Sequence, residues 1–302
     1  MQMQNPIPAN YARSQPRHMS KARGCLAVLF VTTLLFMCTI TAMIALYITF
    51  PPAPIDILVM GLDSRGNEGS VTRTDSIIVV GINPARLDVS LLSIPRDIFV
   101  NVPGYGLQRI NTVNVLAEMN NPGSGRELLA QTIEANFGIG IDKTIRLDFQ
   151  AFTALVDAVG GITVDVPSLV VDNNYPTADY GTMSIRFEPG VQQMNGDQAL
   201  IYARTRHQDD DYRRAERQQR VISALTVKML NPLNWGRAYV AIVQNTESDL
   251  SLLDMALMTP PVLFSAGDLN QLVVNRDYIL PGDGYVVPNY EALRPYIQEN
   301  FD

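Results

Sequence analysis

An uninterrupted apolar run near the N-terminus constrains this chain more than any other feature. Residues 25–50 contain no charged side chain, and as a helix with a rise of ~1.5 Å per residue they would cross a hydrocarbon core ~30 Å thick. The preceding residues, 1–24, carry four basic side chains and no acidic one, so the positive-inside rule predicts that they are cytoplasmic and that the rest of the chain is outside. The alternative is a cleaved signal peptide, whose apolar core is shorter and is followed by a small-residue cleavage site.

The transmembrane interpretation divides the chain into four parts. We expect a basic cytoplasmic tail (1–24), one transmembrane helix (25–50), a proline-rich spacer (51–55) and one extracytoplasmic domain (56–302), whose motif-bearing core is 56–230. The protein would then be a single-pass membrane protein with its domain outside.

The cysteines and charges narrow what the domain can do. Both cysteines, Cys25 and Cys38, fall in the apolar run, so thiol chemistry in the domain is excluded. Nineteen Lys and Arg residues lie outside the tail against 30 Asp and Glu residues, which argues against nucleic acid as a partner. Nearly all these basic residues are arginines, whose planar guanidinium group suits bidentate contact with phosphate.

Three strand-like runs open the domain, at 56–61, 75–82 and 88–94. Short connections between them predict an antiparallel meander. In that topology the end of the first strand, the start of the second and the end of the third lie at one edge of the sheet. The charged residues at these places are Asp63, Arg73, Asp75, Arg96 and Asp97.

Helices and strands alternate after this meander. A capping box at residues 124–127 predicts a helix that ends at Gly138, and Asp148 is a predicted N-cap for a helix over 149–159, before a strand at 162–166. Residues 167–195 show little periodicity and are expected to be rich in loops, and beyond Pro232 helical patterns return, with an extended stretch at 272–274. The mixture predicts a layered α/β domain.

We call the sheet edge with Asp63, Arg73, Asp75, Arg96 and Asp97 the charged edge, and two interpretations of it are open. Asp63 and Asp75 could share one Mg²⁺ ion, because a hard divalent cation takes one or two carboxylates together with substrate phosphate oxygens; they could equally be solvated loop carboxylates. Arg96 and Asp97 could face a ligand or form an internal salt bridge. Arg109 and Asn111 follow on the same side of the sheet, with the same two readings.

The densest signal is a group of six arginines within residues 204–220. A helix that begins after Asp211 would place Arg214, Arg217 and Gln218 on one stripe, followed by apolar residues. Its first turns would offer guanidinium groups and a positive helix end to phosphate, and its later turns could line a channel for a hydrocarbon tail. In the alternative, these arginines form a solvated face that pairs with neighbouring acidic residues.

The order of these motifs along the chain resembles the LytR-CpsA-Psr family, over residues 55–230 most strongly. The motifs are Gly61-Leu-Asp63, Arg73-Thr-Asp75-Ser, Ser93-Ile-Pro-Arg96-Asp97, Arg109-Ile-Asn111, Tyr202-Ala-Arg204-Thr-Arg206 and Asp211-x-x-Arg214-x-x-Arg217-Gln218. The resemblance implies a three-layer α/β/α sandwich with a mixed central sheet, an apolar pocket for a polyprenyl chain and an arginine-lined mouth for pyrophosphate. Arg109 departs from the family, which usually has lysine there.

The resemblance also implies roles for these residues. Asp63 and Asp75 would bind Mg²⁺, with Mn²⁺ as the alternative ion, and Asp97 would position groups near the phosphates. Arg73 and Arg96 would act on the reacting phosphates, and the substrate would be held by Arg109, Asn111, Arg204, Arg206, Asp211, Arg214, Arg217 and Gln218.

The expected activity is that of a bacterial cell-wall phosphotransferase. It would move a phospho-glycan from a polyprenyl-pyrophosphate carrier to a wall acceptor, a peptidoglycan hydroxyl by resemblance, and release polyprenyl phosphate. Two other functions fit the same residues: a hydrolase of polyprenyl pyrophosphates, and a non-catalytic module that binds lipid phosphate or wall glycan. Transfer and hydrolysis stay open, as does the choice between Asp75 and Asp97 as base.

Overall fold

The computed structural model describes residues 20–62, 71–177, 181–205, 211–265 and 269–301. The chain separates into two compact units, Met1–Pro51 and Pro52–Asp302. The first contains helix α1 (Ser20–Thr49), in which Cys25–Thr49 is long and apolar enough to cross a membrane. This helix coincides with the predicted span and is consistent with a single-pass anchor.

The second unit is built on a six-stranded sheet with the order β11-β6-β1-β2-β3-β12. The predicted meander is confirmed, because β1 pairs antiparallel with β2 and β2 with β3. Strand β6 runs parallel to β1 and β12 runs parallel to β3, so the sheet is mixed. The strands are β1 (Ile55–Leu62), β2 (Thr74–Asn83), β3 (Asp88–Ile94), β6 (Lys143–Leu147), β11 (Glu247–Ser248) and β12 (Asn270–Val273).

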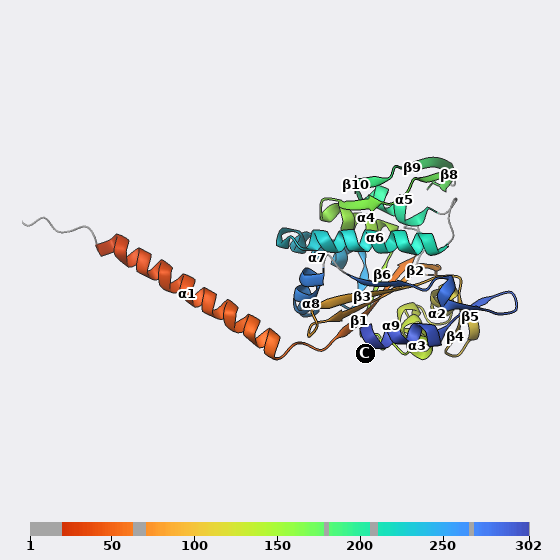
Figure 1. Ribbon diagram of the computed structural model, residues 1–302, viewed down its shortest axis with the longest axis horizontal. Coiled ribbons are helices and arrows are strands. Elements are labelled where there is room, and N and C mark those ends of the chain that lie inside the picture. Colours follow the sequence, from red (N-terminus) through yellow and green to blue (C-terminus); the bar gives the residue numbers. More distant parts are fainter. Residues whose placement is uncertain (1–19, 63–70, 178–180, 206–210, 266–268, 302) are drawn as a thin grey trace, which may run out of the picture. The chain divides into compact units, whose positions relative to one another are not determined.

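Helices cover both faces of this sheet, as predicted for a three-layer sandwich (Figure 1). One face, which includes Leu58, Met60 and Val79, is fully buried against α2, α3, α9 and the β4–β5 hairpin. The other face lies toward α6 and α8, where Met258 packs against Ile57 and Val89. These elements are α2 (Val113–Asn120), α3 (Gly125–Phe137), α6 (Asp211–Met229), α8 (Leu252–Ser265), α9 (Tyr290–Asn300), β4 (Phe99–Val102) and β5 (Gly106–Arg109).

A second apolar core lies beyond α6 and includes Val156, Val164 and Tyr202. It is formed by α4 (Phe149–Ala158), α5 (Gly196–Arg204), α7 (Trp235–Asn245), β7 (Ile162–Val166), β8 (Val170–Pro176), β9 (Thr182–Phe187) and β10 (Gly190–Met194) together with α6. The remaining elements are η1 (Ile110–Thr112), η2 (Pro232–Asn234), η3 (Arg276–Tyr278), β13 (Ile279–Pro281) and β14 (Val286–Pro288).

The predicted helix ends are partly confirmed. Asp148 caps α4 by accepting a hydrogen bond from the backbone N–H of Ala151, and Gly138 ends α3 in the left-handed conformation, with φ of 75°. The prediction of a capping box at 124–127 was wrong, because the Ser124 hydroxyl donates to the Asn121 carbonyl and makes no cap hydrogen bond to α3.

The expectation that 167–195 is rich in loops was also wrong, since β8, β9 and β10 occupy most of this segment. Strand β10 pairs with the earlier strand β7, and the β8–β9 register shifts between Asp172 and Tyr175. Such a shift breaks the period-two alternation by which strands are detected in a sequence.

Candidate functional site

The predicted charged edge begins with an irregularity in strand pairing. Gly61 of β1 lies opposite Ser76 and Leu62 lies opposite Thr74, so the register skips Asp75. A bulge of this kind redirects a side chain at a sheet edge. A Cβ atom on Gly61 would lie 3.0 Å from the Cβ of Ser76, so the glycine permits the close approach of the two strands.

Three charged side chains meet beside this bulge. Nη1 of Arg96 donates a 2.7 Å hydrogen bond to Oδ1 of Asp75, and Nε of Arg96 lies 3.5 Å from Oδ2 of Asp97. The side chains of Asp75 and Arg96 are 15% and 19% exposed, and that of Asp97 is 45% exposed. The structure therefore brings together Asp75, Arg96 and Asp97, and Arg73 is exposed immediately before β2. Asp63 lies outside the described residues.

The donor chemistry at this edge fits a hard divalent cation. Asp75 offers a partly exposed carboxylate, the ligand type that Mg²⁺ and Mn²⁺ prefer. Among the described residues, which omit Asp63, no group of three or more His, Cys, Asp or Glu side chains could hold a metal ion. An ion bound by Asp75 would therefore need further oxygen ligands, of the kind that phosphate and water supply.

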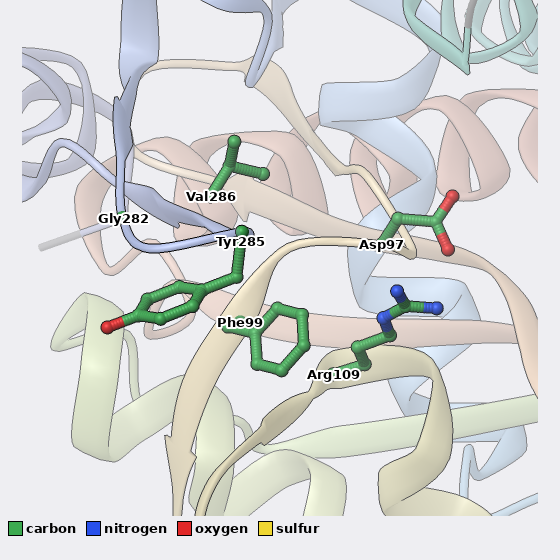
Figure 2. A pocket seen from close by; sticks show the side chains of 7 residues that line it. Asp97, Phe99, Arg109, Gly282, Tyr285 and Val286 are labelled. Carbon is green, nitrogen blue, oxygen red and sulfur yellow. The ribbon is translucent and has the colours of Figure 1, made fainter.

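A hollow of about 320 Å³ opens next to Asp97 (Figure 2). Asp97, Phe99 and Arg109 line it from the β4–β5 side. Gly282, Gly284 and Tyr285 line it from the connection between β13 and β14, and Val286 from the start of β14. The guanidinium carbon of Arg109 lies 5.5 Å from the centre of the Phe99 ring, so the predicted residue Arg109 is on a surface that Asp97 shares.

The predicted residue Asn111 supports the backbone of this region. It is buried, and its N–H donates to the Arg96 carbonyl at 3.2 Å, while the N–H of Ile110 donates to Ile98 at 3.0 Å. These bonds hold the segment that carries Arg96 and Asp97.

Arg204 lies at the same edge of the sheet. Strand β6 runs parallel to β1, so Phe149, which follows it, begins α4 at that edge. The guanidinium carbon of Arg204 lies 3.8 Å from the centre of the Phe149 ring, and its Nη1 donates to the Tyr175 hydroxyl at 3.1 Å. A stack of this type keeps the plane of the guanidinium in one orientation.

Arg214 and Arg217 on α6 are both buried, with 4% exposure. Nη2 of Arg217 donates to the carbonyl of Thr205, whose hydroxyl donates to Asp172 at 2.7 Å. Gln218 is half-buried. The solvated-face alternative therefore does not describe Arg214 and Arg217, although Arg220 and Glu216 do form an exposed pair 4.0 Å apart. Arg206 lies outside the described residues, as does the side chain of Asp211.

Gln219 was not predicted, yet it joins α6 to the sheet. Its Nε2 donates to the Ser93 hydroxyl at 2.9 Å and to the Leu272 carbonyl at 3.1 Å. Ser93 stands three residues before Arg96, so the helix with the arginine stripe is attached to the strand that carries the charged edge.

A buried ion pair behind the edge was also missed. Nη1 of Arg146 donates to Oε1 of Glu118 at 2.6 Å, and both side chains are buried. Burial raises the pKa of Glu118, but hydrogen bonds from the N–H of Gly123, from Arg146 and from the N–H of Gly125 outweigh it and hold that pKa below its usual range. The only sequence signal was an arginine in the short segment Lys143–Leu147, in alternation with Thr144.

Asn114 connects this pair to the start of β2. Its Oδ1 accepts a 3.4 Å hydrogen bond from Nη1 of Arg146, and its Nδ2 donates to the Thr72 carbonyl at 2.8 Å. The buried pair therefore supports the segment that leads into Asp75.

Comparisons with known proteins agree with this fold. The LytR_cpsA_psr family model matches residues 48–294. The polyisoprenyl-teichoic acid–peptidoglycan teichoic acid transferase TagV of Bacillus subtilis is 30% identical over 261 residues, which is 82% of this chain and 65% of that relative. The transferase of the same description, TagU, from Oceanobacillus iheyensis is 37% identical over 172 residues, which is 56% of this chain and 50% of that relative.

The crystal structure of B. subtilis TagV superposes with a TM-score of 0.67 at 28% identity, covering 83% of this chain and 98% of that one. The chain spans one half to two thirds of the full length of the two curated relatives, TagV and TagU. Because the family model covers nearly the whole of the second unit as well as the last residues of α1, the chain belongs to the LytR_cpsA_psr family.

Proposed function

We propose that this chain transfers a phosphate-linked wall glycan from a polyprenyl-pyrophosphate carrier to a hydroxyl of peptidoglycan and releases polyprenyl phosphate. The observation that carries the proposal is the cluster of Asp75, Arg96 and Asp97 beside the bulge, with Arg204 held at the same sheet edge. Carboxylates and oriented guanidinium groups are what a pyrophosphate and a divalent cation require. The two relatives named as teichoic acid transferases support the class of reaction.

The two faces of the sheet support a lipid-linked donor. Leu58, Met60 and Val79 on one face are fully buried. On the face toward α6 and α8, Ile57, Ile82 and Val89 are buried but Val59, Val80 and Ile145 beside them are only partly buried. Apolar side chains that the protein does not fully cover favour an apolar ligand. We therefore assign this face to the prenyl chain.

The chemistry follows from these positions. The acceptor oxygen forms a bond to the phosphorus next to the sugar, the bond from that phosphorus to the bridging oxygen breaks, and the bridging oxygen leaves with polyprenyl phosphate. The hydroxyl proton passes to a carboxylate, for which Asp75 and Asp97 are the candidates. Arg96 and Arg204 hold the phosphate oxygens and offset the charge on the leaving group. A Mg²⁺ ion bound at Asp75 would supply further positive charge there.

The decisive test uses the full chain in detergent with a glycan-bearing polyprenyl pyrophosphate and soluble peptidoglycan fragments, with and without Mg²⁺, and mass spectrometry of the products. Phospho-glycan on the fragments, lost in Asp75→Asn, is the expected result. Asp88→Asn is the matched control, because Asp88 pairs with Arg86 at 3.5 Å at the opposite edge of the sheet.

Two other outcomes would contradict the transferase proposal and favour one of its alternatives. Release of free phospho-glycan without transfer would show a hydrolase, and an unchanged but bound donor would show a binding module. If transfer proceeds equally well in the presence of a chelator, Mg²⁺ has no part in it.

The orientation of the chain is part of the same proposal. The basic tail before α1 should be cytoplasmic and the second unit outside. An epitope at the C-terminus should be accessible to antibody on intact spheroplasts, and one at the N-terminus only after permeabilisation; the reverse pattern would place the proposed site on the wrong side of the membrane.

A further inference from the structure

We propose that the hollow between the β4–β5 hairpin and the β13–β14 connection binds a sugar ring of a wall glycan. Phe99 and Tyr285 form its stacking surface, and Arg109 and Asp97 form its polar rim. The inference rests on the proposed function and deepens it, because it assigns a carbohydrate subsite beside the charged edge.

Two aromatic rings from distant parts of the sequence meet in this hollow. Phe99 opens β4, Tyr285 precedes β14, and their ring centres lie 5.3 Å apart with an angle of 42° between the planes. Both residues are only partly buried, and Figure 2 shows the two rings side by side at the hollow. Partly exposed aromatic surface in a concavity is suited to a flat, partly apolar ligand.

The local backbone holds the Tyr285 ring in place. A Cβ atom on Gly282 would lie 2.5 Å from Cε2 of Tyr285, so the ring packs directly over the glycine backbone. Gly284, with φ of +79°, makes the turn just before the tyrosine. Glycine at both positions lets the connection present an aromatic ring close to its own backbone.

The polar rim completes the match to a sugar. The Arg109 guanidinium lies 5.5 Å from the Phe99 ring centre, and Figure 2 shows it on the side of the hollow where the Asp97 carboxylate lies. A sugar ring has an apolar C–H face that stacks on aromatic rings and hydroxyls around its rim that bond to charged groups. At about 320 Å³ the hollow is at the lower end of ligand pockets, which hold ~300–1,000 Å³, and it is too small and polar for a prenyl chain.

Asp97 connects the hollow to the charged edge. It lines the hollow and lies 3.5 Å from Arg96, which bonds to Asp75. A hydroxyl of a sugar in the hollow would therefore face the carboxylates that the proposed reaction uses. The sugar could belong to the acceptor or to the glycan of the donor, and both present the same chemistry to this surface.

The test is calorimetric titration of the full chain in detergent with two separate probes: a disaccharide fragment of the peptidoglycan backbone, and the wall glycan without its lipid. Tyr285→Ala and Phe99→Leu should each weaken binding at least fivefold, while Tyr285→Phe, which keeps the ring, should bind like the wild type. Tyr239→Ala on α7 is the matched aromatic control. Gly282→Val, which displaces the Tyr285 ring without removing it, should also weaken binding.

The outcomes separate the two proposals. Ring-dependent binding of the peptidoglycan fragment makes the hollow an acceptor site, and ring-dependent binding of the lipid-free glycan makes it a donor-glycan site; both support the inference even if the wild type shows no transfer. Loss of binding in a Tyr285→Ala variant that unfolds at the wild-type temperature excludes unfolding as the cause. If neither probe binds, or if all folded variants bind equally, the sugar site is overturned while the transferase proposal stands.

Discussion

Arg96 and Asp75 are 21 residues apart in the sequence, yet Nη1 of Arg96 donates a 2.7 Å hydrogen bond to Oδ1 of Asp75 across two strands that meet at one edge. Nε of the same guanidinium faces Asp97 at 3.5 Å. Arg96 therefore bridges the carboxylate proposed to bind the metal and the carboxylate that lines the neighbouring hollow.

Glycan transfer should require the planar guanidinium group of Arg96 and not only its positive charge. In Arg96→Lys a single ammonium group cannot reach both carboxylates with the same geometry, so kcat/KM for glycan transfer should fall by ~10²-fold, as when one stabilising donor is removed from an active site. Arg86→Lys, at the opposite edge, should retain activity within about twofold. Full activity in Arg96→Lys would remove this residue from the mechanism.

The bulge at Asp75 should depend on Gly61. In Gly61→Ala the new Cβ would lie 3.0 Å from the Cβ of Ser76, so the start of β2 must move and transfer activity should fall more than thermal stability. Adding Ser76→Gly removes the opposing atom and should restore activity. Gly140→Ala, where a Cβ would meet nothing within 4 Å, is the control; a Gly61→Ala variant as active as this control would contradict the argument.

The pair of Glu118 and Arg146 should contribute strongly to the free energy of unfolding. Glu118→Gln removes the buried charged partner of Arg146 and leaves it only the exposed Glu247, which should cost ~3–5 kcal/mol. Glu247 contacts the same arginine but is 58% exposed, so Glu247→Gln should cost only ~0–1 kcal/mol. Urea unfolding followed by the fluorescence of Trp235, the only tryptophan of the chain, measures both. Equal costs would show that burial does not decide the strength of this interaction.

The same glutamate predicts how stability changes with pH. The pKa of Glu118 is lower in the folded protein than in the unfolded chain, so its contribution is present above the unfolded pKa and is lost as pH falls through the folded one. The urea midpoint should therefore drop on acidification below the usual glutamate range, and less steeply in Glu118→Gln. The urea midpoint of the variant should still depend on pH, because Asp254 also has a lowered pKa. The largest cause is the hydrogen bond that Asp254 accepts from the backbone N–H of Ser251. An identical slope in the variant would exclude Glu118 as the source.

The stack of Arg204 on Phe149 should orient the donor phosphate. Arg204→Lys keeps the charge but loses the planar contact at 3.8 Å, so KM for the donor should rise by ~10-fold, an effect of the size given by ~1.4 kcal/mol. Phe149→Leu should produce a smaller change in the same direction. Arg186→Lys, on an exposed part of β9, should leave KM unchanged. A KM in Arg204→Lys equal to that control would show that the charge alone is sufficient.

Much of the framework could be predicted from local patterns. The apolar run of α1, the strands β1 to β3 and the N-cap at Asp148 depend on residues close together in the chain. Short connections between the three strands impose an antiparallel order, and this order alone places Asp75, Arg96 and Asp97 at one edge.

Other features depended on contacts between distant segments. Three contacts join residues that no local periodicity brings together. They are the β1–β2 register that skips Asp75, the buried pair of Arg146 and Glu118, and the contact of the Phe99 and Tyr285 rings. The strands over 170–194 were missed for the same reason, since β10 finds its partner in β7 and the β8–β9 ladder is shifted. The sequence by itself determined the apolar helix, the first three strands and which charges share an edge, because hydrophobic period and turn length are local. Only the tertiary structure decided where those charges point and what packs behind them, because strand register and side-chain packing are set by the whole fold.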